Sequence, residues 1–171
     1  IIGVGLIGGS IGLAARERIE GLGEISGWDP DTAALSEAVK LGSNDRAATS
    51  LEDAAAGADL VVLASPVATL AANAASALAV VGEDSVVTDV GSTKREIVAA
   101  VGDPRFIGGH PIAGAETAGV EHARADLFED STWFVTPTPT TTGTGLERLM
   151  RFAKNLGAQP HAVGAEDHDK L

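Results

Sequence analysis

The chain has 171 residues, of which 44% are hydrophobic and only 4% are aromatic. That length allows one full domain, or one domain and the start of another, around a core of small and branched side chains. The net charge of −12 argues against nucleic acid or an anionic membrane as a partner, although a local dipole can still bind an anionic small molecule. The absence of cysteine excludes disulfides, thiolate metal sites and a cysteine nucleophile, and it is compatible with a cytoplasmic location.

The two ends of the sequence are abrupt. No segment approaches the roughly 18–20 apolar residues that a membrane span requires, and no secretory signal is visible. The sequence opens on two isoleucines, already inside an expected strand, and it stops at Leu171 as a helix begins. We therefore expect a fragment of a longer protein, cut at both ends.

Strand-like and helix-like segments alternate along the whole chain. The expected strands cover residues 1–4, 24–28, 59–64, 85–89, 105–107, 132–136 and 159–163. The expected helices cover residues 6–19, 31–41, 66–81, 93–101, a stretch ending at 128, 145–156, and 166 onward. This alternation predicts an α/β fold with a doubly wound, mostly parallel sheet, in which ligands bind beyond the carboxyl ends of the strands.

Residues 3–8 (GVGLIG) have the spacing GxGxxG between the first strand and the first helix. Gly3 allows a tight turn, Gly5 lets a pyrophosphate approach the backbone, and Gly8 lets the helix pack close to the strand. Leu6 and Ile7 complete the loop, and the amide groups at the helix N-terminus suit phosphate groups. The pattern predicts a dinucleotide-binding loop of the Rossmann type.

An aspartate at the end of the second strand supports this prediction. Asp29 follows Gly8 at the spacing from which a carboxylate accepts hydrogen bonds from both ribose hydroxyls. It would also repel a 2′-phosphate, and no Arg or Lys follows within residues 29–39, which favours NAD over NADP as the cofactor. The alternative is a glycine-rich turn followed by an aspartate that caps the next helix.

The third strand ends in Ser65, Pro66 and Val67. In doubly wound folds this strand end lies near the nicotinamide half of the cofactor, so all three residues are candidate cofactor contacts. Ser65 directly before Pro66 is also the arrangement of an ordinary helix N-cap, and the two interpretations are compatible.

The fourth strand ends in the segment DVGSTK, which opens the following helix. This position places Asp89 and Gly91 among the candidate cofactor contacts and Ser92 at the ligand edge of the sheet. A cluster of N-cap residues is the alternative interpretation.

A histidine follows the fifth expected strand, in the segment GGHPIAGAE. Pro111 holds His110 in extended geometry. An unperturbed imidazole is largely neutral at pH 7, so one ring nitrogen of His110 can accept a proton as a general base. A lone histidine is also commonly structural, but the preceding glycines and the strand-end position favour the functional interpretation.

The remaining titratable residues are less informative. Glu116 is either a carboxylate at a helix start or a gating group at the pocket. His122 and His161 lack any comparable context, so we expect them to face solvent or to be structural. No spacing of His, Asp and Glu predicts a metal site.

Several motifs together resemble the prephenate/arogenate dehydrogenase family of tyrosine biosynthesis. The resemblance rests on GVGLIGGSIG (3–12), ASPV (64–67), DVGSTK (89–94), the segment 108–130, and His168 with Asp169. It implies oxidative decarboxylation of prephenate or arogenate, with hydride transfer to NAD(P)+. Within that resemblance, His110 corresponds to the catalytic histidine, Ser92 to a serine that contacts the substrate hydroxyl, and His168 to a histidine that lines the substrate pocket.

The resemblance also implies a domain organisation. We expect residues 1–163 to form the dinucleotide-binding domain, and residues 164–171 to begin a helix that leads to a missing helical domain. In the family that domain forms the homodimer and supplies an arginine for a substrate carboxylate. We therefore expect the chain alone to bind NAD but to be weakly active or inactive.

Two other functions remain open. One is another dehydrogenase on the same fold, of the β-hydroxyacid or pyrroline-carboxylate reductase type. The other is a non-catalytic dinucleotide sensor, which would keep residues 3–8 and Asp29 without needing Ser92 and His110 at adjacent strand ends. The sequence does not distinguish prephenate from arogenate.

Overall fold

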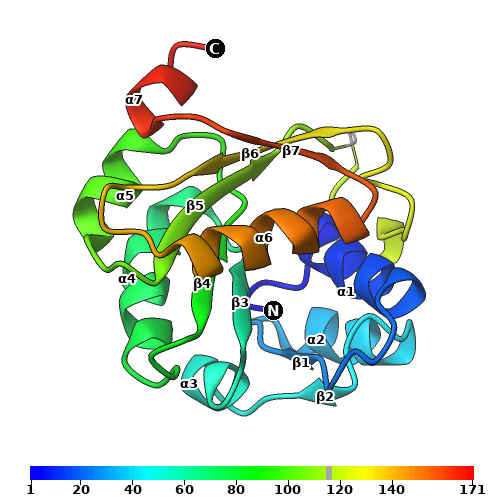
Figure 1. The fold of residues 1–171 in the computed structure, drawn as a ribbon. Helices are drawn as coiled ribbons and strands as arrows, with labels where there is room; N and C mark the ends of the chain where they lie inside the picture. The colour runs from blue at the N-terminus through cyan, green and yellow to red at the C-terminus, as the bar shows by residue number, and fades with distance from the viewer. Residues whose placement is uncertain (115–116) are drawn as a thin grey trace.

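The computed structural model describes residues 1–114 and 117–171. Its centre is a five-stranded sheet in the order β3-β4-β5-β6-β7 (Figure 1). The strands are β3 (Leu60–Leu63), β4 (Val86–Asp89), β5 (Phe106–Pro111), β6 (Thr132–Thr136) and β7 (Gln159–Ala162). Every neighbouring pair is parallel except β5 and β6, which confirms the mostly parallel sheet that the sequence predicts.

A smaller parallel pair, β1 (Ser26–Gly27) and β2 (Arg46–Ala47), lies beside the main sheet. Ile2 joins the two because it bridges in parallel to Trp28 on one side and to Leu63 on the other. The expected strand 1–4 is thus represented by this single bridging position. The backbone runs from it straight into the glycine loop.

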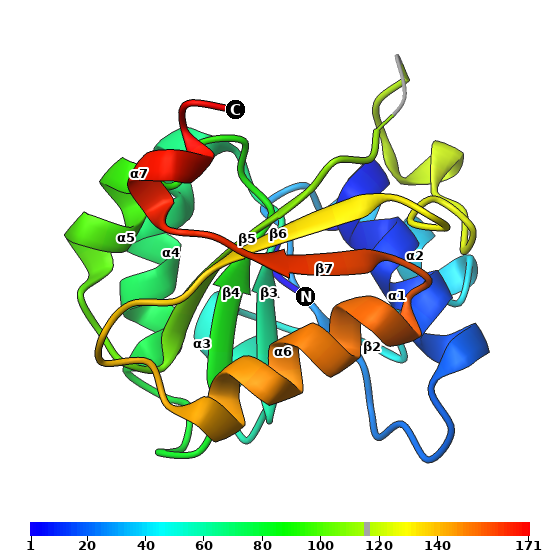
Figure 2. The same cartoon turned by 45° about the horizontal axis from the view of Figure 1, so that its top comes forward.

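Helices cover both faces of the sheet (Figure 2). They are α1 (Leu6–Arg18), α2 (Thr32–Lys40), α3 (Leu51–Ala55), α4 (Val67–Leu78), α5 (Arg95–Val101), α6 (Gly143–Asn155) and α7 (Ala165–His168). Alternate residues of β3 face opposite sides, so Val62 packs into the core with α1 and α6, whereas Val61 and Leu63 pack with α3 and α4. Two apolar cores on one sheet confirm the doubly wound architecture.

The structure differs from the sequence prediction in three places. Strand β5 extends to Pro111 instead of ending at residue 107, so His110 lies inside a strand, opposite Phe134 of β6. The helix expected before residue 128 is only a short 3-10 turn, Val120–His122. The sequence prediction also missed β2 and α3, which are too short to produce a clear periodicity.

Glycines explain the extension of β5. A Cβ atom on Gly108 would lie 2.4 Å from the hydroxyl of Thr136 on β6, and one on Gly109 would lie 2.5 Å from the carbonyl oxygen of Asp89 on β4. Only residues without a side chain allow both neighbouring strands to approach β5 this closely. The two glycines therefore hold His110 in the sheet rather than in a loop beyond it.

Candidate functional site

The glycine loop has the geometry that its spacing predicts. Gly3 has a φ of +89°, a backbone conformation that favours glycine. A Cβ on Gly8 would lie 1.9 Å from the carbonyl oxygen of Gly3, so this position requires glycine for the close contact between helix and loop. At Gly5 the corresponding space is open, with no atom within 4 Å. No side chain caps the N-terminus of α1, which leaves its amide groups available to a phosphate.

Asp29 lies directly beside this loop. Its Oδ2 accepts a hydrogen bond from the amide of Val4 at 2.9 Å, and its Oδ1 accepts one from the amide of Asp31 at 2.9 Å. The cap of α2 is Asp31, whose side chain accepts from the amides of Ala33 and Ala34. The alternative interpretation of Asp29 as a helix cap is therefore wrong. Its partly exposed carboxylate is instead fixed next to the open space at Gly5.

The end of β3 packs against the same loop. A Cβ on Gly3 would lie 2.7 Å from the carbonyl carbon of Ala64 and 2.8 Å from the amide nitrogen of Ser65. Helix α4 begins at Val67 with Pro66 in the cap position, so Ser65 is not the N-cap. The Ser65 hydroxyl instead accepts hydrogen bonds from Asn73 at 2.8 Å and from Thr69 at 3.2 Å.

A cavity of about 640 Å³ lies at the carboxyl ends of β4 and β5. Its polar side contains Ser92, His110 and His168, so the structure brings together three residues that the sequence assigned to one site. Ile112 and Phe134 supply an apolar side. The cavity thus offers an apolar surface beside groups that can exchange a proton.

His110 is the base candidate within this cavity. Its Nδ1 lies 3.0 Å from Nε2 of His168. Burial of the ring, together with the nearby His168 and Lys94, lowers the pKa of His110 from 6.5 to about 4, although Asp169 acts in the opposite direction. His110 is therefore neutral at pH 7 and able to accept a proton.

His168 lies behind His110 rather than beside a substrate. The exposed fraction of its side chain is 4%, and both of its ring nitrogens are occupied. Nε2 faces His110, and Nδ1 lies 2.8 Å from Oδ1 of Asp169. His168 lines the cavity as expected, but in this arrangement neither of its ring nitrogens is free to bind a substrate directly.

Asp89 has a different role from the one that the sequence suggested. We expected it to contact the cofactor, but its side chain is 0% exposed and forms an ion pair with the equally buried ammonium of Lys94. The same carboxylate accepts the amides of Gly91 at 2.8 Å and of Gly109 at 3.1 Å. Asp89 therefore organises the backbone around His110 from inside the protein.

Ser92 is exposed on the cavity and is not a helix cap. Helix α5 begins at Arg95, and its first amides are taken by Asp169, which accepts from Lys94 N at 2.8 Å and from Arg95 N at 3.0 Å. The cap position of α5 is Lys94, and no side chain of this segment caps the helix, so the interpretation as a cluster of capping side chains is wrong. Sequence reasoning missed Asp169 as a site residue, because nothing local indicates its contact with a helix more than seventy residues earlier.

Further predictions concern two other histidines, Glu116 and metal binding. His122 and His161 are exposed, as expected. Glu116 lies outside the described residues. Within residues 1–114 and 117–171 there is no cluster of His, Asp and Glu that could hold a metal ion, and no helix there is long and apolar enough to cross a membrane.

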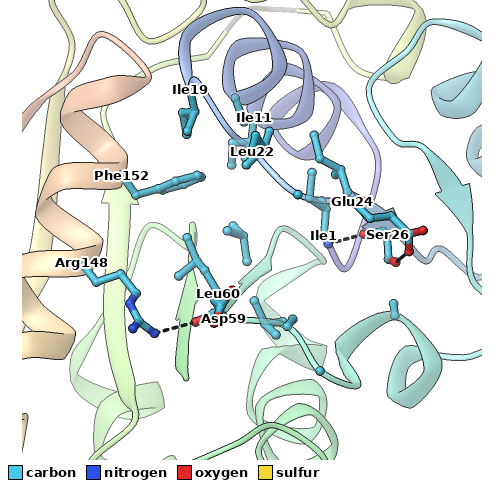
Figure 3. Close-up of a pocket in the computed structure, with 18 of the residues that line it drawn as sticks. Ile1, Ile11, Ile19, Leu22, Glu24, Ser26, Asp59, Leu60, Arg148 and Phe152 are labelled. Atoms are coloured by element: carbon cyan, nitrogen blue, oxygen red, sulfur yellow. Dashed lines mark hydrogen bonds between the residues drawn. The ribbon is translucent and has the colours of Figure 1, made fainter. Parts of the chain in front are cut away.

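A second hollow, of about 470 Å³, opens at the amino ends of the strands (Figure 3). Its walls are largely apolar and include Ile11 and Ile19 of α1 and Phe152 of α6, while Arg148 at its edge donates to the carbonyl of Asp59. It contains none of the predicted site residues. The two ends of the sheet are therefore distinct, and the candidate chemistry lies at the carboxyl end.

The fold and the glycine loop define the class of this protein: it is a dinucleotide-binding domain of the Rossmann type. Residues 11–161 match the family described as "Prephenate dehydrogenase, nucleotide-binding domain". The chain belongs to this family.

Individual relatives agree with this assignment. Prephenate dehydrogenase of Bacillus subtilis is 34% identical over 175 aligned residues, which cover 99% of this chain and 47% of that protein. The solved prephenate dehydrogenase of Aquifex aeolicus, in complex with hydroxyphenyl propionate and NAD+, is 36% identical with a TM-score of 0.91 over 98% of this chain and 60% of that one. Synechocystis arogenate dehydrogenase is 26% identical with a TM-score of 0.88, over 99% of this chain and 60% of that one. The chain spans about half to three-fifths of the length of these relatives.

Proposed function

We propose that this chain is the NAD-binding part of an enzyme that oxidatively decarboxylates prephenate or arogenate. In the proposed reaction the ring carbon that bears the hydroxyl loses a hydride, the hydroxyl loses its proton, and the ring carboxylate leaves as CO2. When bound, NAD+ supplies the hydride acceptor. The observation that carries the proposal is the grouping of His110, Ser92 and His168 on one cavity, at the carboxyl end of the sheet that also carries the dinucleotide loop.

His110 is the proposed catalytic base. Its Nδ1 is occupied by His168, so the Nε2 atom is the nitrogen that remains to take the proton of the ring hydroxyl. Ser92 is proposed to hold the same hydroxyl, because it is exposed on the same cavity. The apolar side chains of Ile112 and Phe134 suit the carbon ring of such a substrate.

The proposed cofactor site follows the sheet edge. The loop formed by Gly3, Gly5, Leu6, Ile7 and Gly8 would hold the pyrophosphate, since the amides of α1 are uncapped. Asp29 would accept hydrogen bonds from the ribose hydroxyls, which favours NAD over NADP.

The nicotinamide half of the proposed site lies between two strand ends. The backbone of Ser65, Pro66 and Val67 would border it on one side, because this segment packs directly against the glycine loop. Gly91 would border it on the other side. The buried Asp89 would contribute only by holding the amide of Gly91 in place.

The proposal includes a second part of the protein. Residues 1–163 would form the dinucleotide-binding domain, and residues 164–171 would begin the connection to a helical domain that completes the substrate site and forms a homodimer. The greater length of the relatives supports this proposal. We further propose that the complete enzyme acts in the cytoplasm.

The test is turnover by the full-length protein, followed as NADH absorbance with prephenate and with arogenate in separate assays. Formation of NADH with either substrate supports the proposal and identifies the substrate, and repetition with NADP+ tests the cofactor preference. NAD binding without turnover of either substrate would contradict it and would favour a different dehydrogenase or a dinucleotide sensor.

A further inference from the structure

We propose that Asp169 is a positioning residue that acts through His168 to hold His110 in the tautomer whose Nδ1 carries the proton. The proposal rests on the proposed function in one respect, namely that His110 is the base. It adds a reason why the Nε2 atom of that base is free of a proton before the reaction.

The ionised carboxylate of Asp169 can only accept hydrogen bonds. The pKa of Asp169 is lowered to about 2, because hydrogen bonds from His168 and from two backbone amides outweigh the effect of burial. Asp169 is therefore charged at neutral pH. Its Oδ1 lies 2.8 Å from Nδ1 of His168, so this nitrogen must be the donor.

The tautomer of His168 then determines the tautomer of His110. A neutral imidazole with a proton on Nδ1 has a lone pair on Nε2. Nε2 of His168 lies 3.0 Å from Nδ1 of His110, so the His110 nitrogen donates and its own Nε2 becomes the acceptor. The opposite arrangement requires protons on both ring nitrogens of His168, and the spectra described below distinguish the two.

The geometry of the three residues is fixed by the surrounding structure. Asp169 also accepts the first amides of α5, at 2.8 Å from Lys94 N and 3.0 Å from Arg95 N, so it cannot rotate without uncapping that helix. The ring of His168 packs edge-on against Phe134 at 5.5 Å between centroids and against His110 at 5.1 Å. The short helix α7 lies beside α5 (Figure 2) and also contacts β6, and its last residue, His168, reaches His110 on β5.

The charged groups around the two rings belong to different elements. Lys94, in the cap position of α5, lowers the pKa of His110, whereas Asp169 raises it. Asp89 on β4 pairs with Lys94, and Arg95 and Glu96 of α5 line the same cavity. Among residues 1–114 and 117–171, Asp169 is the carboxylate in direct hydrogen-bond contact with the histidine pair, so we assign the positioning role to it.

The test uses full-length protein with histidines labelled with ¹⁵N, and reads the tautomers from long-range ¹H–¹⁵N spectra at neutral pH. His110→Asn and His168→Asn variants assign the two rings. We expect both rings to carry the proton on Nδ1. A proton on Nε2 of His110 in the wild-type protein would overturn the proposal, whatever the enzymatic activity.

The variant Asp169→Asn completes the test. We expect it to mix the two tautomers of His110 and to lower kcat about 10²-fold, because a base in the wrong tautomer cannot accept the substrate proton. The affinity for NAD+ should not change. Asp167→Asn is the matched control, since Asp167 lies two residues before Asp169 but its carboxylate pairs with the exposed Lys170, and it should leave the tautomers and kcat unchanged.

The spectra separate failure of this inference from failure of the proposed function. The expected tautomers in a protein that turns over neither prephenate nor arogenate would contradict the proposed function alone. Wild-type tautomers and kcat in Asp169→Asn would contradict the positioning role. If Asp169→Asn does not fold, His168→Asn takes its place: the tautomers of His110 should mix once its link to Asp169 is removed, and an unchanged Nδ1–H tautomer would overturn the role.

Discussion

The buried ion pair between Lys94 and Asp89 yields the sharpest prediction about stability. Both side chains are 0% exposed, and Lys94 is the cation paired with the Asp89 carboxylate. The substitution Lys94→Met removes the charge but largely preserves the length of the side chain. It leaves Asp89 with the amides of Gly91 and Gly109 as its donors.

The expected magnitude follows from this burial. Removal of one partner of a buried ion pair typically costs about 3–5 kcal/mol, because the remaining charge is neither solvated nor paired. We expect Lys94→Met to lower the free energy of unfolding by this amount at pH 7, measured by urea denaturation followed by circular dichroism. Lys170→Met is the control: its ion pair with Asp167 is 72% and 71% exposed, and its loss should change stability by less than about 0.5 kcal/mol.

The pH dependence of the stability of Lys94→Met tests the same reasoning in a second way. Burial raises the pKa of Asp89, and Lys94 opposes that shift, so the variant should have a still higher pKa at Asp89. The folded variant then binds a proton at a pH where the unfolded chain does not, and its stability rises relative to the wild type as pH falls. A loss of less than about 1 kcal/mol at pH 7, or a deficit that widens in acid, would refute the reasoning.

Two further predictions concern the cofactor and the base. Asp29→Ala should weaken NAD+ binding about 10-fold or more in calorimetric titration, because hydrogen bonds to a charged group contribute roughly 1.5–3 kcal/mol, whereas NADP+ binding should not weaken. Asp31→Ala, which removes only the cap of α2, is the control and should leave the NAD+ affinity unchanged. The lowered pKa of His110, about 4, predicts that kcat/KM rises with pH as the ring loses its proton and reaches its plateau above about pH 5. A limb centred near 6.5 would show that burial does not perturb the ring.

The order of elements was predictable because local patterns determine it. The alternating apolar runs indicate strand and helix, and the GxGxxG spacing has one well-understood geometry, so the sheet and the loop of residues 3–8 required no long-range information. The position of Asp29 beside this loop was predictable for the same reason. Its position relative to Gly8 follows from one βαβ unit.

The features that the sequence did not reveal depend on distant contacts. The carboxylate of Asp89 looks like a strand-end ligand, and only the folded structure shows that Lys94 and two amides enclose it. Asp169 caps a helix far earlier in the chain, so no spacing rule could identify it. The extension of β5 likewise depends on β6, which pairs with Gly108 and Gly109 after an intervening loop.

We propose that His110 is the base of a dehydrogenase and that NAD+ binds without contribution from this histidine. The most direct measurement is single-turnover NADH formation by the full-length His110→Asn variant with saturating prephenate or arogenate, together with calorimetric NAD+ binding. We predict a rate about 10²–10⁴-fold below the wild type with an unchanged dissociation constant for NAD+. NADH formation within a few-fold of the wild-type rate would contradict the account.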